Sequence, residues 1–218
     1  IWPSDSGTLD TWSAAPAGKI HIDQGDGDSI TNLQDLLGYL VVFKQHSLHR
    51  VIDHGVTATQ DRVRVAPVGT PGRHTAVVAG NLVYFLDEVG QLWSYDVRGD
   101  NEDAVTNLSI SKIGRDTLTD FVSTRLPYAH LHYDPRRDEI YCFLSQDAAT
   151  TTNVAWVYNI NTGGFSRFDW SLDWNVSAAL IDADATVQLI AGSHTGLVAQ
   201  LNTGRHDNGT NITMDVLT

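Results

Sequence analysis

Residues 81–97 read NLVYFLDEVGQLWSYDV, and this stretch predicts a β-hairpin. Leu82–Leu86 is a continuous apolar run, as expected for a strand that is covered on both faces. A short turn follows, in which Gly90 can take the positive φ that such turns need. Leu92–Val97 then alternates, placing successive side chains on opposite faces of a second strand.

The same strand pattern occurs four times from residue 29 onward. The apolar second strands of the four units begin near residues 40, 82, 139 and 187, at intervals of 42, 57 and 48 residues. Four short strands in each unit of roughly 40–50 residues are typical of β-propeller blades. Besides the two arms of the hairpin, the predicted strands are Ser29–Leu33, Leu40–Lys44, Ser47–Ile52 and Asp61–Ala66 in the unit near 29–66, His74–Ala79 and Leu108–Ile113 in the unit near 74–113, Tyr128–His132, Glu139–Leu144, Val154–Asn159 and Phe165–Asp169 in the unit near 128–169, and Val176–Ile181, Val187–Ala191, Leu197–Leu201 and Ile212–Val216 in the unit near 176–216.

The predicted fold class is all-β and β-propeller-like. About four four-stranded blade units make up one domain over residues 29–218, preceded by a loop-rich N-terminal segment over residues 1–28. A four-stranded blade cannot bury both of its faces alone, and stacking blades around an axis covers their apolar strands. A sandwich or a barrel also uses many short strands and is the alternative.

One short helical insertion and an incomplete ring are also expected. Positions 118, 121, 122 and 125 follow helical spacing, which predicts a helix over Arg115–Leu126 that ends at Pro127. Four blades are at the low end for closure of a ring. The sequence begins at Ile1 and its single methionine is Met214, so we expect a partial ring, or one that further chain completes.

Composition and charge exclude several classes of protein. The sequence has 14 Lys and Arg against 26 Asp and Glu, a net charge of −12, and the acidic residues are scattered. Such a surface repels phosphate backbones, which disfavours non-specific binding to DNA or to anionic membranes. The longest apolar run, Leu36–Phe43, is too short to span a bilayer. The single cysteine, Cys142, can form no intrachain disulfide and is expected to be a small buried hydrophobe.

Three stretches carry residue types that could bind a ligand, and each also has a simpler interpretation. Asp23–Asp28 holds three carboxylates and two glycines, like a site for a hard cation, but an exposed glycine-rich turn is favoured because the spacing of a calcium loop is missing. His130 and His132 share one face of a strand, which suits a metal, although packing inside a blade is favoured. Tyr133–Glu139 is predicted to be a polar turn, with arginines that could bind an acidic partner.

Other motifs give weaker indications. Ser4–Thr8, followed by Trp12, resembles the Asp-box of sialidase propellers, but its spacing differs from that motif. Four Asn-x-Ser/Thr acceptor patterns arise easily by chance in a chain of this composition, and they begin at Asn107, Asn175, Asn208 and Asn211. The sequence shows neither a nucleotide-binding fingerprint nor a hydrolase motif, so we expect no catalytic residues, no cofactor, no metal and no enzymatic activity.

Several phrases resemble tail structural proteins of tailed bacteriophages. GDGDSITNLQDLLGYLVVFKQHSLHRV (25–51) is similar to a phrase in those proteins in which one strand leads to an apolar strand that ends in a basic residue and a serine. VGTPGRHTAVVAGNLVYFLDEVGQLWSYD (68–96) is similar to their next unit. YAHLHYDPRRDEIYCFLS (128–145) and VAWVYNINTGGFSRFDW (154–170) are similar to a third. The resemblance covers about two-thirds of the chain and rests on packing and turn residues.

The resemblance implies a virion structural protein, similar to the propeller-like nozzle or tail-tube proteins of short-tailed phages. Such proteins form rings, commonly hexamers, around the DNA exit channel, beside other tail proteins such as the adaptor and the fibres. Viral DNA would pass without specific binding, and an acidic lumen would help because fixed carboxylates cannot replace the counterions of DNA. The tryptophans at 2, 12, 170 and 174 are expected to anchor subunit contacts.

Two rival functions stay open at this point. A carbohydrate-binding or glycan-degrading propeller could stack sugars on its loop tryptophans. A cellular scaffold propeller could present its loops to protein partners. The phage tail protein, located in the virion, is the preferred hypothesis.

Overall fold

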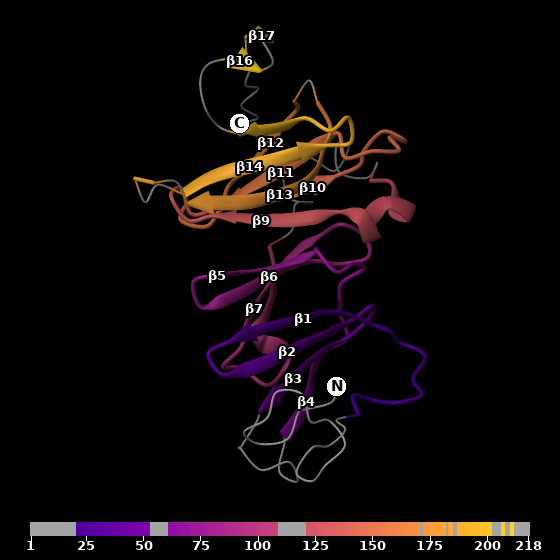
Figure 1. Cartoon of the computed structure of the whole chain (residues 1–218). Coiled ribbons are helices and arrows are strands. Elements are labelled where there is room, and N and C mark those ends of the chain that lie inside the picture. The colour runs from indigo at the N-terminus through magenta and orange to yellow at the C-terminus, as the bar shows by residue number, and fades with distance from the viewer. Residues whose placement is uncertain are drawn as a thin grey trace, which may run out of the picture.

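The protein, in a computed structural model, consists almost entirely of antiparallel strands (Figure 1). The structure describes residues 21–52, 61–108, 121–170, 172–181, 183–184, 187–201, 206–207 and 210–211. The elements are blade 1, with β1 (Ile30–Leu36), β2 (Tyr39–Lys44), β3 (Leu48–Ile52) and β4 (Asp61–Ala66); blade 2, with β5 (Ala76–Ala79), β6 (Leu82–Leu86), β7 (Leu92–Asp96), η1 (Glu102–Ala104) and β8 (Val105–Asn107); the 3-10 helix η3 (Ser123–Tyr128); blade 3, with β9 (His130–Asp134), β10 (Glu139–Leu144), β11 (Val154–Asn159) and β12 (Phe165–Phe168); blade 4, with β13 (Trp174–Ile181), β14 (Val187–Ser193) and β15 (Val198–Gln200); and a small hairpin, β16 (His206–Asp207) and β17 (Thr210–Asn211).

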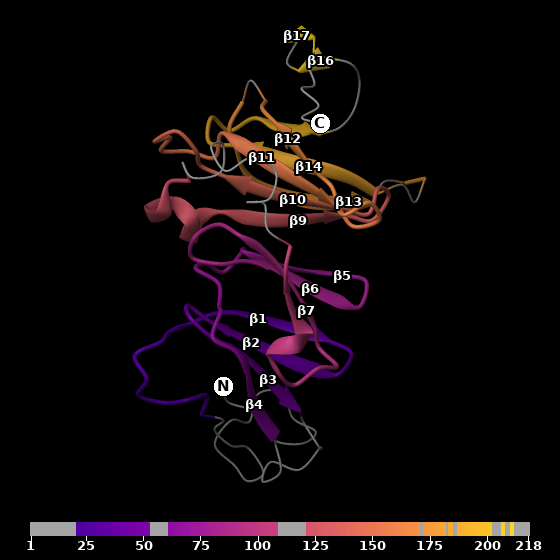
Figure 2. The same ribbon diagram turned by 180° about the vertical axis from the view of Figure 1, so that it is seen from behind.

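Every blade is a meander in which each strand pairs with the next one in the sequence. Blades 1, 2 and 3 have four strands each, and blade 4 has three within the described part of the chain. Together they confirm the prediction of an all-β, propeller-like fold built from four successive units. Figures 1 and 2 show the blades stacked one after another, with blade 1 at one end and blade 4 at the other.

The first strands of neighbouring blades lie side by side along one edge of the stack. β1 contacts β5, β5 contacts β9, and β9 contacts β13. Residues just before β5 hydrogen-bond to both neighbouring strands: the Leu131 amide in β9 donates to the His74 carbonyl at 2.8 Å, and the Asn32 side chain in β1 donates to the Arg73 carbonyl at 2.6 Å. This edge, called the inner edge below, therefore brings together residues from all four blades.

The hairpin formed by β6 and β7 packs against a blade on each side. Phe85 in β6 belongs to a core cluster shared with blade 1, where its ring lies 5.0 Å from that of Phe43. Leu86, the next residue, belongs to a cluster shared with blade 3 that includes Ile140. Because neighbouring side chains on a strand point to opposite faces, a continuous apolar run is needed here. Gly90 has φ +81 in the turn, as the sequence predicts.

The two end blades differ in how their outward faces are covered. One face of blade 4 packs on blade 3, where Trp174 and Leu189 meet Tyr141 and Phe143. The outward face of blade 1 forms a small cluster of Val42 and Val51 that is covered by Ile22, from the segment before β1. The outward face of blade 4 has exposed apolar residues, described below.

Some predicted boundaries are wrong, for local reasons. The fourth strand of blade 2 is Val105–Asn107 instead of Leu108–Ile113, because the chain pairs with β7 directly after η1; residues 109–113 lie outside the described part. The described end of the expected helix, Arg115–Leu126, is not α-helical: Phe121 bridges to Gln146, and η3 follows. Pro127 lies within η3 instead of ending a helix before it.

The structure describes only part of the segments at the two chain ends. Residues 21–28 form turns without a strand, in keeping with a loop-rich N-terminal segment, whereas residues 1–20 lie outside the described part. The strand predicted at Ile212–Val216 also lies outside it. In the described ranges, the structure contains no helix that is long and apolar enough to cross a membrane.

Candidate binding site at the inner edge

Two adjoining cavities, of about 610 and 200 Å3, open at the inner edge where the chain enters β5, β9 and β13. Both are lined by the same four residues, Arg73, His74, Tyr128 and Asn175. We call this place the inner-edge site. The larger cavity has a size typical of small-molecule sites. Its further lining residues are Thr31, Pro71, Gly72, Arg125, Pro127 and Thr152, and those of the smaller cavity are Gln34, Ala76, His130, Leu131, Val176 and Ser177.

A tight turn before β5 holds Arg73 and His74 in place. The buried Thr75 hydroxyl donates to the Gly72 carbonyl at 2.6 Å and accepts from the Gly72 amide at 3.1 Å. The Thr70 hydroxyl lies next to that of Thr75 and bonds to the Leu86 carbonyl at 2.7 Å. Since these buried groups satisfy one another, the two exposed side chains between them start from a fixed backbone.

The connection before β9 supplies Arg125 and Tyr128 from η3. The guanidinium carbon of Arg125 lies 4.5 Å from the centre of the Tyr128 ring, a cation–π arrangement that orients both side chains. The two connections approach closely, because a Cβ added at Gly72 would lie 2.3 Å from the Pro127 carbonyl oxygen. Only glycine fits at that position. The Arg125 Nε is buried and has no hydrogen-bond partner.

His130, at the start of β9, is a buried histidine with unused hydrogen-bonding capacity. It is 6% exposed, and its ring stacks on Phe143 with the centres 4.4 Å apart and the planes 8° apart. Neither ring nitrogen has a hydrogen-bond partner. Burial, together with the nearby His132 and His74, lowers the pKa of His130 to about 3. The ring is therefore neutral near pH 7, with one donor and one acceptor nitrogen.

The inner-edge site is basic in a chain that is strongly acidic overall. Arg73, Arg125 and His74 line it, and no Asp or Glu is among the described residues that line either cavity. In the described part of the chain, neither arginine has a carboxylate partner within ion-pair distance. With a net charge of −12 on the whole sequence, this separation of charge sets the site apart from the rest of the surface.

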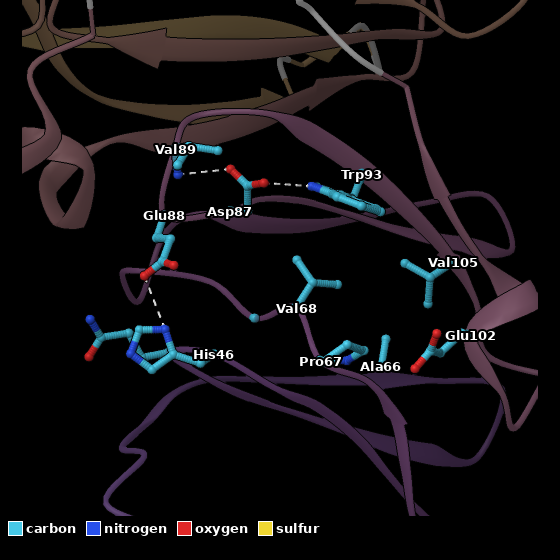
Figure 3. A pocket seen from close by; sticks show the side chains of 12 residues that line it. His46, Ala66, Pro67, Val68, Asp87, Glu88, Val89, Trp93, Glu102 and Val105 are labelled. Carbon is cyan, nitrogen blue, oxygen red and sulfur yellow. Dashed lines mark hydrogen bonds and ion pairs between the residues drawn. The ribbon is translucent and has the colours of Figure 1, made fainter.

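Another cavity, of about 420 Å3, lies between blades 1 and 2 (Figure 3). Asp87 is buried at its edge and accepts hydrogen bonds from Trp93 Nε1 at 2.9 Å and from the Gln91 amide at 2.8 Å. Burial raises the pKa of Asp87, although these donors oppose the change. His46 Nδ1 lies 3.0 Å from a Glu88 oxygen. The Asp87, Glu88 and His46 side chains at this cavity therefore bind protein groups, and Ala66, Pro67, Val68, Val89 and Val105 give it apolar walls.

The acidic loop Asp23–Asp28 binds polar groups of β2 and of the β2–β3 turn. Asp26 contacts the buried ammonium of Lys44 with both oxygens, at 2.6 and 2.8 Å, and the Asp23 carbonyl accepts from the same group at 3.1 Å. Asp28 accepts from the Ser47 hydroxyl at 2.8 Å. The Lys44 side chain lowers the pKa of Asp26. The loop thus closes over the end of β2.

The predicted polar turn and the predicted histidine pair both lie in blade 3. Tyr133–Glu139 joins β9 to β10, and the buried Asp134 holds the Arg136 guanidinium at 3.2 Å. His130 and His132 pack within blade 3, and no group of three or more metal-binding residues occurs among the described residues. Cys142 is buried, which raises the pKa of its thiol.

The tryptophans predicted as subunit anchors differ among themselves. Trp174 is buried between blades 3 and 4, so the prediction of a subunit contact is wrong for it. Trp170 is half-buried and stacks on Phe143 with the ring centres 5.7 Å apart. Trp2 and Trp12 lie outside the described residues, as does the Ser4–Thr8 motif.

The Asn-x-Ser/Thr patterns are placed unevenly. Asn107 is half-buried and donates to the Gln91 side chain at 2.6 Å, whereas Asn175 is exposed in β13 and lines the inner-edge site. Asn211 lies in β17, and Asn208 is outside the described part.

Sequence reasoning missed the residues that form the inner-edge site. Arg73 and Arg125 lie in two different connections between blades, 52 positions apart, and Asn175 lies in β13 of a further blade. Only the stacking of the blades brings them together. A usable signal was present in the sequence Gly-Thr-Pro-Gly-Arg-His-Thr (69–75), where a turn leads to two basic residues at the start of a predicted strand.

No protein-family model and no curated protein sequence matches the chain. Solved structures with a similar fold include the computationally designed Ika4 protein, at 12% identity and a TM-score of 0.49, covering 83% of this chain and 95% of that one. A europium-containing methanol dehydrogenase has 13% identity and a TM-score of 0.49, with 84% of this chain and 41% of that one covered. The Pan2 WD40 domain of Neurospora crassa has 13% identity and a TM-score of 0.45, with 87% and 48% covered.

The chain spans less than half of the length of the dehydrogenase and WD40 structures. At these identities the activities of those proteins do not carry over to this chain.

Proposed function

We propose that the protein is a non-enzymatic structural subunit that works by assembly, with copies stacking head to tail into a ring. The observation that supports this proposal is the outward face of blade 4. Val176, Leu180 and Val198 are 60, 53 and 68% exposed there. Their cross-strand partners place them on one face: Val176 and Val198 both lie opposite Gly192 in β14. Exposed apolar residues clustered on one sheet face mark an interaction surface.

At each junction between neighbouring blades of one copy, the corresponding face is covered by the next blade. Blades 2 and 3 meet through Leu86 and Ile140, and blades 3 and 4 meet through Phe143 and Leu189. A further blade packed on blade 4 would continue this interface. A second copy can supply that blade through the part of the outward face of blade 1 that Ile22 leaves open, where Leu33, opposite Val42, is 48% exposed.

A contact between blade 4 of one copy and blade 1 of the next joins two different surfaces. Such head-to-tail contacts generate closed rings when the rotation between copies closes. The resemblance to bacteriophage tail proteins suggests a specific setting for the ring, namely the virion tail around the DNA exit channel, commonly with six copies. The net charge of −12 disfavours non-specific contact with DNA over most of the surface, and the basic inner-edge site is the exception.

Complementary variants test the head-to-tail contact. Val198→Asp and Leu33→Asp each place a charge on one of the two faces, and Val89→Asp is a matched control in the exposed β6–β7 turn, where Val89 is 60% exposed. By light scattering after gel filtration, we expect oligomers for the wild type and the control and monomers for each face variant. An equimolar mixture of the two face variants should give a heterodimer, because one intact pair of faces remains.

A wild type that is monomeric at every concentration would refute the proposed assembly. If Val198→Asp dissociates the oligomer but Leu33→Asp does not, copies meet through blade 4 alone and no ring forms. The tail location is tested separately, by searching purified phage particles for this protein at a fixed copy number. Turnover of bacterial surface polysaccharide would contradict the non-enzymatic role.

A further inference from the structure

We propose that the inner-edge site binds an oxyanion, the carboxylate or phosphate group of a small organic ligand, with Arg73 and Arg125. Both arginines line the larger cavity and come from neighbouring connections, before β5 and before β9. Guanidinium groups bind carboxylates and phosphates through paired N–H donors in a fixed planar geometry. This inference does not depend on assembly, since all lining residues belong to one copy.

The first argument is that the guanidinium groups have hydrogen-bonding capacity that the described residues do not use. In folded proteins the large majority of buried polar side-chain atoms have a hydrogen-bond partner, but the buried Arg125 Nε has none. The described residues also offer neither Arg73 nor Arg125 a carboxylate. Elsewhere in the protein, Lys44, Arg98 and Arg136 each contact an acidic residue at 2.6 to 3.2 Å. Arg62, Arg64 and Arg137 also lack a carboxylate among the described residues, but Arg73 and Arg125 are the arginines that line a cavity together.

The second argument comes from the unpartnered atoms of the adjoining smaller cavity. His130 is almost fully buried and both of its ring nitrogens lack a partner, and the Ser177 hydroxyl is buried without one as well. Both residues line that cavity, which opens next to Arg73 and His74. Leaving several buried polar groups unpaired costs stability unless a ligand or water satisfies them. A bound ligand with hydroxyl or carbonyl groups beyond its oxyanion would satisfy these groups.

The third argument is that the site is preorganised. The hydrogen-bonded turn between Thr70 and Thr75 fixes the backbone at Arg73, and the Tyr128 ring holds the Arg125 guanidinium at 4.5 Å. Close contact between Gly72 and Pro127 locks the two connections together. The backbone of both connections and the Arg125 side chain are therefore in place before a ligand binds, which favours binding. The volume of about 610 Å3 exceeds the needs of a bare ion and suits a ligand of the size of a monosaccharide.

Calorimetry of the purified full chain near neutral pH tests the proposal, with inorganic phosphate, glucuronate and uncharged glucose as probes. We expect binding of phosphate, of glucuronate or of both, no binding of glucose, and weaker affinity at high ionic strength. Preference between phosphate and glucuronate identifies the group that the site takes. If neither anion binds, the proposal is wrong.

Variants locate the binding. Arg73→Gln and Arg125→Gln should each weaken the anion affinity by about tenfold or more, the effect of losing a charge-assisted contact. Arg137→Gln is the matched control, because it removes the same charge from the exposed β9–β10 turn. Equal losses in the control would show that only the net charge matters and would overturn the site.

A spectroscopic readout keeps the test independent of small changes in stability. In NMR spectra of the wild type, adding phosphate or glucuronate should shift the ring signals of His74 and His130 and leave those of His46, in the β2–β3 turn, unchanged. Arg73 is exposed, so Arg73→Gln should fold normally, and about ten times more ligand should be needed to reach the same shifts. Shifts that saturate at the same ligand concentration as in the wild type would contradict the role of Arg73.

Discussion

Replacing Phe85 by alanine should destabilise the junction between blades 1 and 2 by about 3–5 kcal/mol, the usual cost of deleting a buried aromatic ring. The Phe85 ring is fully buried, lies 5.0 Å from Phe43 at an angle of 56°, and stacks at 6.5 Å on Trp93. Its removal leaves a cavity that the strands on either side cannot fill, because their backbones are fixed by ladder hydrogen bonds.

Urea unfolding followed by tryptophan fluorescence measures this loss. With a denaturant slope of about 2 kcal/mol per M, the midpoint of Phe85→Ala should fall by about 1.5–2.5 M. Val89→Ala, in the exposed turn of the same hairpin, is the control and should change stability by less than about 0.5 kcal/mol. Equal midpoints for the two variants would refute the packing of β6 between blades.

The variant also tests whether the blades unfold together. In a stack where each blade contacts only its neighbours, a weakened junction can separate the transition into two steps. We expect amide exchange in blade 1 to accelerate more than exchange in blade 3, because the Phe85 ring belongs to the cluster shared with blade 1. Uniform acceleration through all blades would mean that the stack unfolds as one unit.

Three further predictions concern single residues. Cys142 should not react with a thiol reagent in the folded protein, since it is buried with a raised thiol pKa, and should react fully in denaturant; rapid labelling of the native protein would contradict its burial. Folding lowers the pKa of His130 to about 3, from about 6.5 in the unfolded chain, so the folded protein should lose stability as the pH falls through this interval. His130→Phe should remove that part of the acid sensitivity, measured by urea unfolding at several pH values. An unchanged pH dependence in the variant would argue against a buried neutral ring. Gly72→Ala should cost about 1–3 kcal/mol and lower the thermal midpoint, because the new methyl group meets the Pro127 carbonyl; an unchanged midpoint would mean that the two connections can move apart.

Much of the fold follows from local sequence patterns, because burial of a strand on two faces demands a run of apolar residues. Glu139–Leu144 and Val154–Asn159 are predicted with the bounds that the structure has. Prediction fails for β8, a three-residue edge strand with little burial whose position is set by its pairing to β7. The helical spacing before Pro127 also misleads, because tertiary contacts of Phe121 and Leu126 outweigh the local preference.

The inner-edge site could not be derived from spacing in the sequence. Its arginines stand alone in separate connections, and neither is near a second basic side chain that would indicate a cluster, apart from His74 beside Arg73. The spacing of His130 and His132 suggested a metal site or packing inside a blade. The two ring nitrogens of His130 instead lack hydrogen-bond partners beside a cavity, which the spacing does not indicate. Such features depend on which blade edges meet, and this is a property of the stack.

The strand order in every sheet has a consequence for how the protein forms. Each strand pairs with the strand that precedes or follows it in the sequence, so each blade is complete within a few dozen consecutive residues. Contacts between residues close in sequence favour rapid folding, and a chain leaving the ribosome could form blade 1 before blade 3 is synthesised. Each new blade would then find its docking surface already in place. Growth of the stack would proceed from one end, with the newest face always the one left open.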